Sequence, residues 1–447
     1  MLKKIPKGVL ALSSVEMWER FSFYSMQALL VLYASATTLQ GGLGWSEASA
    51  LRLTAFYGSF MYVSPILGGI LADRVLGRRN AVNLGAVLMC IGQLCLAFFA
   101  TTGLYIGIAL LIVGCGLLKP TISAMVGEFY TEHDRRREAA FTIFYMGINI
   151  GGTLGPFLAG SVNQHYGYHM GFFAGALGLV VALVSFAIAN KNSLRDVGIR
   201  MKKKKMNLRI PQIVLTPLEK RRIKVYLTMC VGNIVWNIVY GLPYGLLTLY
   251  ASKNIVRTLG SYTIPAEWYY GLYGVFIVAL CPFLAAFYHK IADSEKQFTL
   301  SHKLAMGYFL VSIGCLILLP MVHNIVLNPT YQGSSWYLIG FYFFFSMSEL
   351  LTVPVLLSAA TRLAPKRYAA AMVSANMLIS WAFGAYLAGE FSVLTINYNA
   401  EYLFWGIIAA TVFFGILHLA FNRRVEALCQ ISDQPIDDLP GEIASER

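Results

Sequence analysis

Long apolar segments alternate with short polar ones along almost the whole chain. A helix that crosses a bilayer needs about 20 consecutive, mostly apolar residues. Twelve such segments follow one another, at roughly 9–36, 50–73, 80–101, 103–128, 139–161, 168–190, 223–251, 267–290, 301–322, 335–361, 368–393 and 402–421. Glycines and prolines inside them do not exclude helices, because neighbouring membrane helices repair the backbone. The pattern predicts an all-α polytopic membrane protein with 12 transmembrane helices.

One long polar stretch between the sixth and seventh segments divides the chain. We expect four parts: an N-terminal six-helix bundle over 1–190, a cytoplasmic basic linker over 191–222, a C-terminal six-helix bundle over 223–422 and a cytoplasmic tail over 423–447. The tail is acidic and poor in apolar residues, which favours disorder after Arg424. Two related six-helix halves are typical of secondary transporters, and in such a layout span one corresponds to span seven and span four to span ten.

Composition and charge support the membrane interpretation. Hydrophobic residues make up 57% of the chain and charged residues 13%, about half the share of a soluble protein. Of the 35 Lys and Arg residues, 30 lie before span one, after span twelve or in alternate loops, which all fall on one side of the membrane. The positive-inside rule therefore predicts that both termini are cytoplasmic. This orientation explains the net charge of +13, so nucleic acid is not an expected partner.

Five ionisable residues lie at membrane depth, away from the ends of the predicted spans, where charges are costly and usually functional. Glu16, Glu19 and Arg20 share one face of the first span because they are spaced i, i+3, i+4. Lys119 and Glu349 lie alone near the middles of spans four and ten, which are equivalent in the two halves.

An unpaired buried charge is expensive. The sequence therefore predicts a Lys119–Glu349 ion pair in at least one conformation, as part of a transport pathway rather than as a static structural pair. The five charges sum to −1, so one added proton would neutralise the cluster.

The cytoplasmic loop after span two resembles the signature loop of the major facilitator superfamily. Its core is Asp73-Arg-Val-Leu-Gly77-Arg78-Arg79. Gly77 permits a turn, Asp73 can meet a helix N-terminus of the other half, and the arginines hold the loop on the cytoplasmic side. The resemblance implies the major facilitator fold.

Four further segments resemble motifs of the proton-dependent oligopeptide transporter family within that superfamily. They are Glu16-Met-Trp-Glu19-Arg20-Phe-Ser-Phe-Tyr24, Gly114-Cys-Gly-Leu-Leu-Lys119-Pro120, Phe144-Tyr145-Met-Gly-Ile-Asn149-Ile-Gly151 and Glu349-Leu-Leu-Thr-Val-Pro354. They occur in the family's order on the expected spans. The chain is thus identified as a divergent member of that family.

The resemblance implies roles for individual residues. It assigns proton coupling to Glu16, Glu19, Arg20 and Lys119, and binding of a peptide amino group to Glu349. Further residues would line the pocket: Tyr24, Tyr62, Tyr145 and Asn149. Helix packing is the competing interpretation for each aromatic, and Tyr57 is an alternative to Tyr62.

Four pocket positions depart from the family. Gln27 stands where the family usually has Arg, and Tyr240, four residues after Trp236, stands where it has Glu. A neutral Gln27–Tyr240 contact, or none, is expected to replace that ion pair. Tyr273 aligns with a family Asn in span eight, and Asn376 lies near a family Trp in span eleven. These changes indicate a remodelled pocket.

The leading interpretation is a proton-coupled symporter that imports di- and tripeptides by alternating access. Its expected place is the cell membrane, in bacteria the inner membrane, where it works as a monomer with substrate, protons and lipid as partners. The alternatives are a transporter for another small solute (an amino acid, a peptide-like metabolite, an anion or a drug) and a substrate sensor that does not transport. The spans hold no metal-ligand cluster and no nucleophile–base arrangement, and no phosphate-binding GxxxxGK[ST] loop occurs. An enzyme or ATP-driven pump is therefore not expected, nor a metal or cofactor; the proton gradient supplies the energy.

Overall fold

The computed structural model describes residues 5–131, 134, 136–194, 197–198, 215–292, 298–363 and 368–430. Helices make up almost all of this part. In chain order they are α1 (Lys7–Ser35), η2 (Thr38–Gln40), α2 (Glu47–Leu71), η3 (Ala72–Leu76), α3 (Arg78–Phe98), α4 (Ala100–Gly127), α5 (Arg136–Tyr166), α6 (Tyr168–Asn192), α7 (Pro217–Gly241), α8 (Leu246–Lys253), α9 (Glu267–Ala292), α10 (Leu300–Leu327), α11 (Trp336–Leu363), α12 (Ala369–Asn376), η5 (Met377–Ala382), α13 (Phe383–Asn397), α14 (Ala400–Ala420) and α15 (Asn422–Gln430). A two-stranded hairpin, β1 (Thr258–Leu259) and β2 (Tyr262–Thr263), precedes α9.

The all-α, multi-pass fold is confirmed. Eleven helical segments in the described residues are long and apolar enough to cross a membrane. The helix α1 is also long enough, with 29 residues, although the charged residues at mid-length make it less apolar than the other eleven. With α1 the described part of the chain has 12 membrane-crossing elements, as the hydrophobic pattern predicts.

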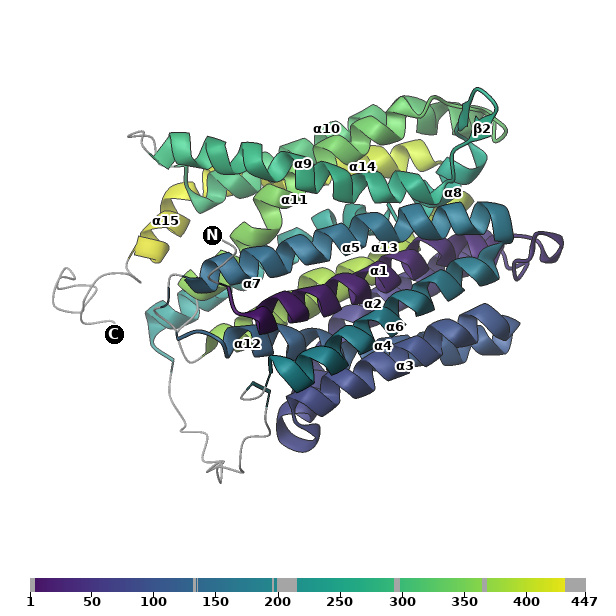
Figure 1. Cartoon of the computed structure of the whole chain (residues 1–447). Helices are drawn as coiled ribbons and strands as arrows, with labels where there is room; N and C mark the ends of the chain where they lie inside the picture. The colour runs from purple at the N-terminus through teal and green to yellow at the C-terminus, as the bar shows by residue number, and fades with distance from the viewer. Residues whose placement is uncertain are drawn as a thin grey trace.

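The helices run side by side along one direction (Figure 1). The β1–β2 hairpin and the α1–α2 loop lie at one end, named here the hairpin end. The start of α1 and the short helix α15 lie at the opposite end, named here the linker end, because α6 ends there and α7 begins there. Helices α2 and α13 pack together, as do α5 and α9, so these two pairs join the first six membrane helices to the last six.

Close helix packing depends on small residues, as is usual in membranes. A Cβ atom on Gly68 of α2 would lie 2.1 Å from the carbonyl oxygen of Gly116 in α4, so only glycine fits at that crossing. The helix start at Pro217 follows from local sequence: Thr216 and Glu219 form a capping box around a proline at the first helical position.

Several details differ from the sequence-based prediction. The seventh helix begins at Pro217 rather than 223, and it breaks between α7 and α8, where Pro243 removes a backbone donor. Residues 422–430 form α15 rather than a disordered tail, since Val425, Leu428 and Cys429 are buried against the bundle. The remainder of the predicted tail and most of the predicted linker lie outside the described residues.

Candidate functional site

The charged face of α1 is buried in the first half of the molecule. Glu16, Glu19 and Arg20 are at most 3% exposed. The Arg20 guanidinium donates from Nε and Nη2 to the two carboxylate oxygens of Glu19, lies 3.7 Å from Glu16 Oε1 and reaches Cys115 Sγ at 3.5 Å. The second oxygen of Glu16 is buried without a hydrogen-bond partner among the described residues. The cluster is thus firmly held at Glu19 and open at Glu16.

Lys119 of α4 joins this cluster from the side. It lies close enough to Arg20, Glu16 and Glu19 for electrostatic interaction with them. No ion pair within 4 Å connects it to a carboxylate of the described residues. Its ammonium lies 5.8 Å from the centre of the Tyr62 ring. The i, i+3, i+4 spacing on α1 and the neighbouring helix α4 therefore bring together the four residues expected to couple protons.

Glu349 lies in the other half, on α11, and its Oε2 atom is buried without a hydrogen-bond partner among the described residues. The position of α11 is fixed by Ser348, the residue that precedes Glu349. Ser348 accepts a hydrogen bond from Trp236 Nε1 at 2.9 Å and donates to the carbonyl of Gly307 at 2.7 Å, which ties α7, α10 and α11 together. The predicted Lys119–Glu349 ion pair is not formed in this structure, so a pair in another conformation stays a prediction.

Aromatic side chains from both halves lie near Glu349, whose carboxyl group is close enough to interact electrostatically with Tyr24, Tyr62 and Tyr240. Tyr62 of α2 packs on Trp381 with ring centres 5.1 Å apart, and Tyr240 packs on the same indole at 5.1 Å. Tyr24 of α1 lies 5.9 Å from Tyr270 of α9. The further members are Trp236, Tyr273 and Phe345. We call this set the aromatic cluster.

Gln27 contacts a different tyrosine from the one expected. Its Oε1 atom accepts a hydrogen bond from the hydroxyl of Tyr270, 2.9 Å away, whereas Tyr240 turns toward Trp236 and Trp381. The expectation was a neutral Gln27–Tyr240 contact or none, and no hydrogen bond joins these two described residues; the neutral partner of Gln27 across the halves is Tyr270. Tyr270 lies one helical turn before Tyr273, so the i, i+3 spacing on α9 was the available signal.

Trp381 is the second residue that the sequence analysis missed. Asn376 ends α12, is 4% exposed and has no partner for Oδ1 among the described residues, while Trp381 lies five residues further on, in the π-helix η5. A π-helical turn holds one more residue than an α-turn and shifts the facing of the residues after it. Span eleven therefore supplies an indole to this site, five residues after Asn376.

Tyr145 and Asn149 lie on one face of α5, as their spacing requires. Asn149 donates to the carbonyl of Tyr145 at 2.9 Å, so its amide is used within its own helix. Tyr145 is 43% exposed and borders a cavity of about 700 Å³ between α5, α9, α10 and α11. That cavity extends to Arg362 near the linker end of α11.

The loop between α2 and α3 is closed on itself. Arg78 donates to Asp73 Oδ1 at 2.8 Å and also pairs with Glu128, at the end of α4. Gly77 has φ +79°, which favours glycine. Asp73 thus meets Arg78 of its own loop in this structure, rather than a helix of the other half as expected.

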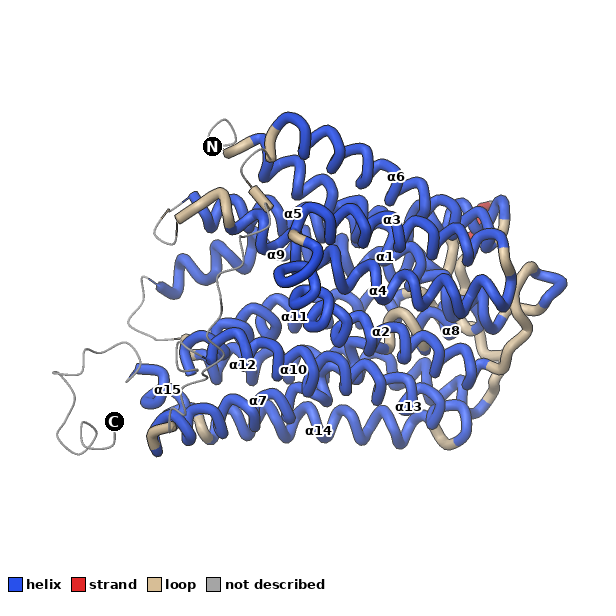
Figure 2. Tube along the Cα trace, turned by 90° about the horizontal axis from the view of Figure 1, so that it is seen from below, coloured by secondary structure: helices blue, strands red, loops and turns tan. Residues whose placement is uncertain are grey.

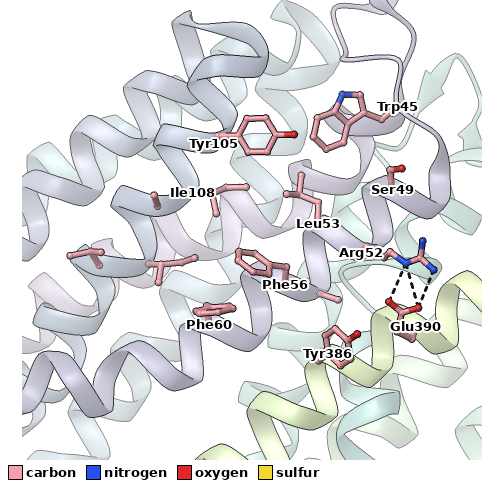
Figure 3. A pocket seen from close by; sticks show the side chains of 14 residues that line it. Trp45, Ser49, Arg52, Leu53, Phe56, Phe60, Tyr105, Ile108, Tyr386 and Glu390 are labelled. Carbon is pink, nitrogen blue, oxygen red and sulfur yellow. Dashed lines mark hydrogen bonds and ion pairs between the residues drawn. The ribbon is translucent and has the colours of Figure 1, made fainter.

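The two halves are tied together at the hairpin end. Arg52 of α2 pairs with Glu390 of α13 through Nε–Oε1 at 3.1 Å, and Lys253 pairs with Glu47. Asn163 of α5 donates to Glu267 of α9 at 2.7 Å. Figure 3 shows Arg52 and Glu390 at the edge of a lateral cavity of about 820 Å³ that α2, α4 and α13 line with mostly apolar side chains.

These polar contacts between the halves lie at the hairpin end, and the Gln27–Tyr270 contact lies beside the aromatic cluster. Buried charges at mid-membrane depth, an aromatic cluster shared by two helical halves, and halves joined at one end define a secondary transporter. The chain belongs to the Major Facilitator Superfamily, which it matches over residues 20–389, and within it to the family of proton-dependent oligopeptide (POT) transporters.

Individual relatives make the likeness specific. The "Uncharacterized transporter YclF" of Bacillus subtilis is 31% identical and covers 93% of both chains. A "Di-/tripeptide transporter" of Lactococcus lactis subsp. cremoris is 30% identical and covers 83% of this chain and 86% of its own. A solved peptide transporter POT in complex with sulfate is 29% identical, with a TM-score of 0.87 over 95% of this chain and 96% of that chain.

Proposed function

We propose that this protein is a proton-coupled symporter that imports di- and tripeptides by alternating access. The family membership and the names of the relatives, two of which are di-/tripeptide transporters of Lactococcus lactis, support the cargo. The positive-inside rule supports an orientation with the linker end, and so both termini, in the cytoplasm. The membrane is the bacterial inner membrane, and the transporter works as a monomer without a cofactor or catalysis.

The observation that carries the proposal is the unpaired carboxylate oxygen of Glu349 beside the aromatic cluster. A buried acceptor without a donor costs free energy until a ligand supplies one. A peptide ammonium does so and adds a charge-assisted hydrogen bond. The aromatic rings shield the site from water and pack against the peptide backbone and side chains.

Proton coupling falls to the charged cluster of Glu16, Glu19, Arg20 and Lys119 in the first half. A proton disturbs the existing hydrogen bonds least on the buried Glu16 oxygen that has no partner, because both oxygens of Glu19 already accept hydrogen bonds from Arg20. A proton on Glu16 weakens the electrostatic attraction between its carboxyl group and the cations Arg20 and Lys119. The freed cation and the ammonium of the peptide then compete for Glu349, which links substrate binding to the change between outward and inward states.

The contacts at the hairpin end support an inward-facing state for this structure, in which substrate leaves toward the linker end. Uptake of labelled dialanine into proteoliposomes, with and without an inward proton gradient, tests the proposal. We expect gradient-driven uptake, and a loss of about tenfold or more in Glu349→Gln, since a hydrogen bond to a charged group contributes about 1.5–3 kcal/mol.

The matched control is Glu401→Gln, which removes a carboxylate at the hairpin end that pairs with His323 and lies outside the cavity. Its uptake should stay within twofold of the wild type, a margin below about 0.5 kcal/mol. A folded wild type that takes up no dialanine contradicts the peptide assignment and leaves the family intact.

A second cargo class has one specific observation in its favour. Gln27 and Tyr270 form a neutral contact where the family usually has a cation that can grip a carboxylate. A solute with an amino group and a weaker need for carboxylate recognition fits such a site. Uptake of a labelled amino acid or peptide-like metabolite in the same proteoliposomes, lost in Glu349→Gln, would favour this class over dipeptides; substrate-dependent signalling without any uptake would favour a sensor.

A further inference from the structure

A cavity of about 380 Å³ lies between three helices of the second half, on the stretch of α7 from Arg221 to Gly232, before the aromatic cluster residue Trp236. Figure 2 shows α7 and α14 side by side along one edge of the molecule, with α15 at their linker end. The cavity is bounded by all three. Its volume is within the range of small-molecule pockets, about 300–1,000 Å³.

The floor and walls of the cavity are apolar. Gly232 is buried at the contact with α14, where a Cβ atom would approach Phe414 to 3.0 Å. Further apolar lining residues come from all three helices: Val225, Met229, Leu417, Phe421, Val425 and Leu428. Such a slot between two membrane helices accepts a hydrocarbon chain from the bilayer.

The rim of the cavity is basic. Arg221 and Lys224, one turn apart on the first turns of α7, face it together with Arg424 of α15, and all three are exposed. No acidic side chain lines the cavity, and none of the three cations takes part in an ion pair with a described residue. The Arg424 guanidinium is held 5.6 Å from the centre of the Phe421 ring, which leaves its N–H groups available to a ligand.

An apolar slot below three cations, at a membrane surface, has the polarity of an anionic phospholipid. Long basic side chains at helix ends extend toward the headgroup layer, and basic pockets between membrane helices on the cytoplasmic side bind anionic headgroups. We propose that this cavity binds one anionic phospholipid, with its phosphate among Arg221, Lys224 and Arg424 and one acyl chain between α7 and α14.

The site rests on the proposed orientation and is independent of the transported solute. A bound lipid acts on the transport site through α7, because this helix carries Trp236 and Tyr240 of the aromatic cluster toward its other end. A lipid that joins the start of α7 to α14 and α15 fixes the base of a helix that forms part of the transport site.

The test is a titration of the full-length protein in detergent with phosphatidylglycerol and with phosphatidylcholine of the same acyl chains, followed by native mass spectrometry. We expect phosphatidylglycerol to bind at least tenfold more tightly. The combined variant Arg221→Gln, Lys224→Gln, Arg424→Gln should lose about a hundredfold of this affinity, or about fivefold per cation, which corresponds to about 1 kcal/mol each.

The control removes three cations from the same surface that do not line the cavity: Lys191→Gln, Lys220→Gln and Arg423→Gln. This variant should bind within about twofold of the wild type. An equal loss in both triple variants overturns the proposal, because general attraction to a basic surface then accounts for binding.

A second variant tests the acyl chain. Thr228 lines the slot, so Thr228→Trp fills the space while all three cations remain. It should lower phosphatidylglycerol affinity at least tenfold, and glycerol phosphate should not compete. Unchanged binding in this variant, displacement by glycerol phosphate, or equal binding of phosphatidylcholine each overturns the proposal.

Discussion

At the scale of single residues, the three buried carboxylates of Glu16, Glu19 and Glu349 have hydrogen-bond partners to very different degrees. Arg20 is held by both oxygens of Glu19 and packs against Phe23, with 4.6 Å from the guanidinium carbon to the ring centre. Glu16 and Glu349 each keep one buried oxygen without a partner among the described residues. Glu19 therefore stabilises the resting structure, whereas the other two carboxylates are placed to accept a proton or a ligand.

This difference predicts unequal costs for isosteric substitutions in one cluster. Glu19→Gln leaves Arg20 buried without its bidentate partner, and breaking a buried pair in this way costs about 3–5 kcal/mol. Glu16→Gln removes only the longer 3.7 Å contact and should cost less than about 1 kcal/mol. Thermal unfolding of the purified variants in detergent measures the order, and a Glu16→Gln protein that melts at or below Glu19→Gln contradicts it.

At the scale of elements, the sequence predicts the membrane helices well because their signal is local. About twenty apolar residues define a span without reference to any neighbour, and the i, i+3, i+4 spacing puts Glu16, Glu19 and Arg20 on one face. The break before α8 has a local signal in Pro243, although the predicted span ran across it, whereas the π-helix η5 has no such signal. The contact of Gln27 with Tyr270 also depends on how α1 and α9 are set against each other. Three-dimensional packing decides which residues of neighbouring helices face each other, so the sequence predicted Gln27 as a site residue and missed its partner Tyr270.

The π-helix η5 gives a prediction for the eleventh span. Trp381 contacts Tyr62 of the first half and Tyr240 and Trp236 of the second, so it joins the two halves within the aromatic cluster. Trp381→Ala removes a buried aromatic side chain from the pocket wall, a change that costs about 3–5 kcal/mol in packing. Substrate affinity should fall at least tenfold, measured as the dependence of dialanine uptake on concentration.

The control for this prediction is Trp405→Ala, because Trp405 lies on α14 with 48% of its surface exposed and contacts no residue of the aromatic cluster. Its affinity should match that of the wild type. A Trp381→Ala transporter with unchanged affinity would mean that η5 serves helix packing alone, and Asn376 would then become the pocket residue of this span.

At the scale of the whole molecule, the halves touch through few polar contacts, and the described ion pairs between them lie on the hairpin side of the cavity. The pairs Arg52–Glu390 and Lys253–Glu47 are partly exposed, so water screens them and each holds the halves together only weakly. Weak contacts suit a transporter, because the closed outer side has to open in every cycle at small cost. The two pairs together bias the equilibrium toward the inward-facing state.

This bias predicts the effect of removing both pairs. In Arg52→Gln combined with Lys253→Gln the outward-facing population should rise, by about twofold or more, and the wild-type population should shift in the same direction at high salt because screening weakens exposed pairs. Electron–electron distances between spin labels at Thr38 and Thr330, two exposed positions at the hairpin end on opposite halves, measure the populations. Glu401→Gln is the matched control, since His323–Glu401 is a pair at the same end that lies within one half. The double variant should lengthen the label distance while the control does not; an equal response in both would mean that charge at the hairpin end, rather than contact between the halves, sets the equilibrium.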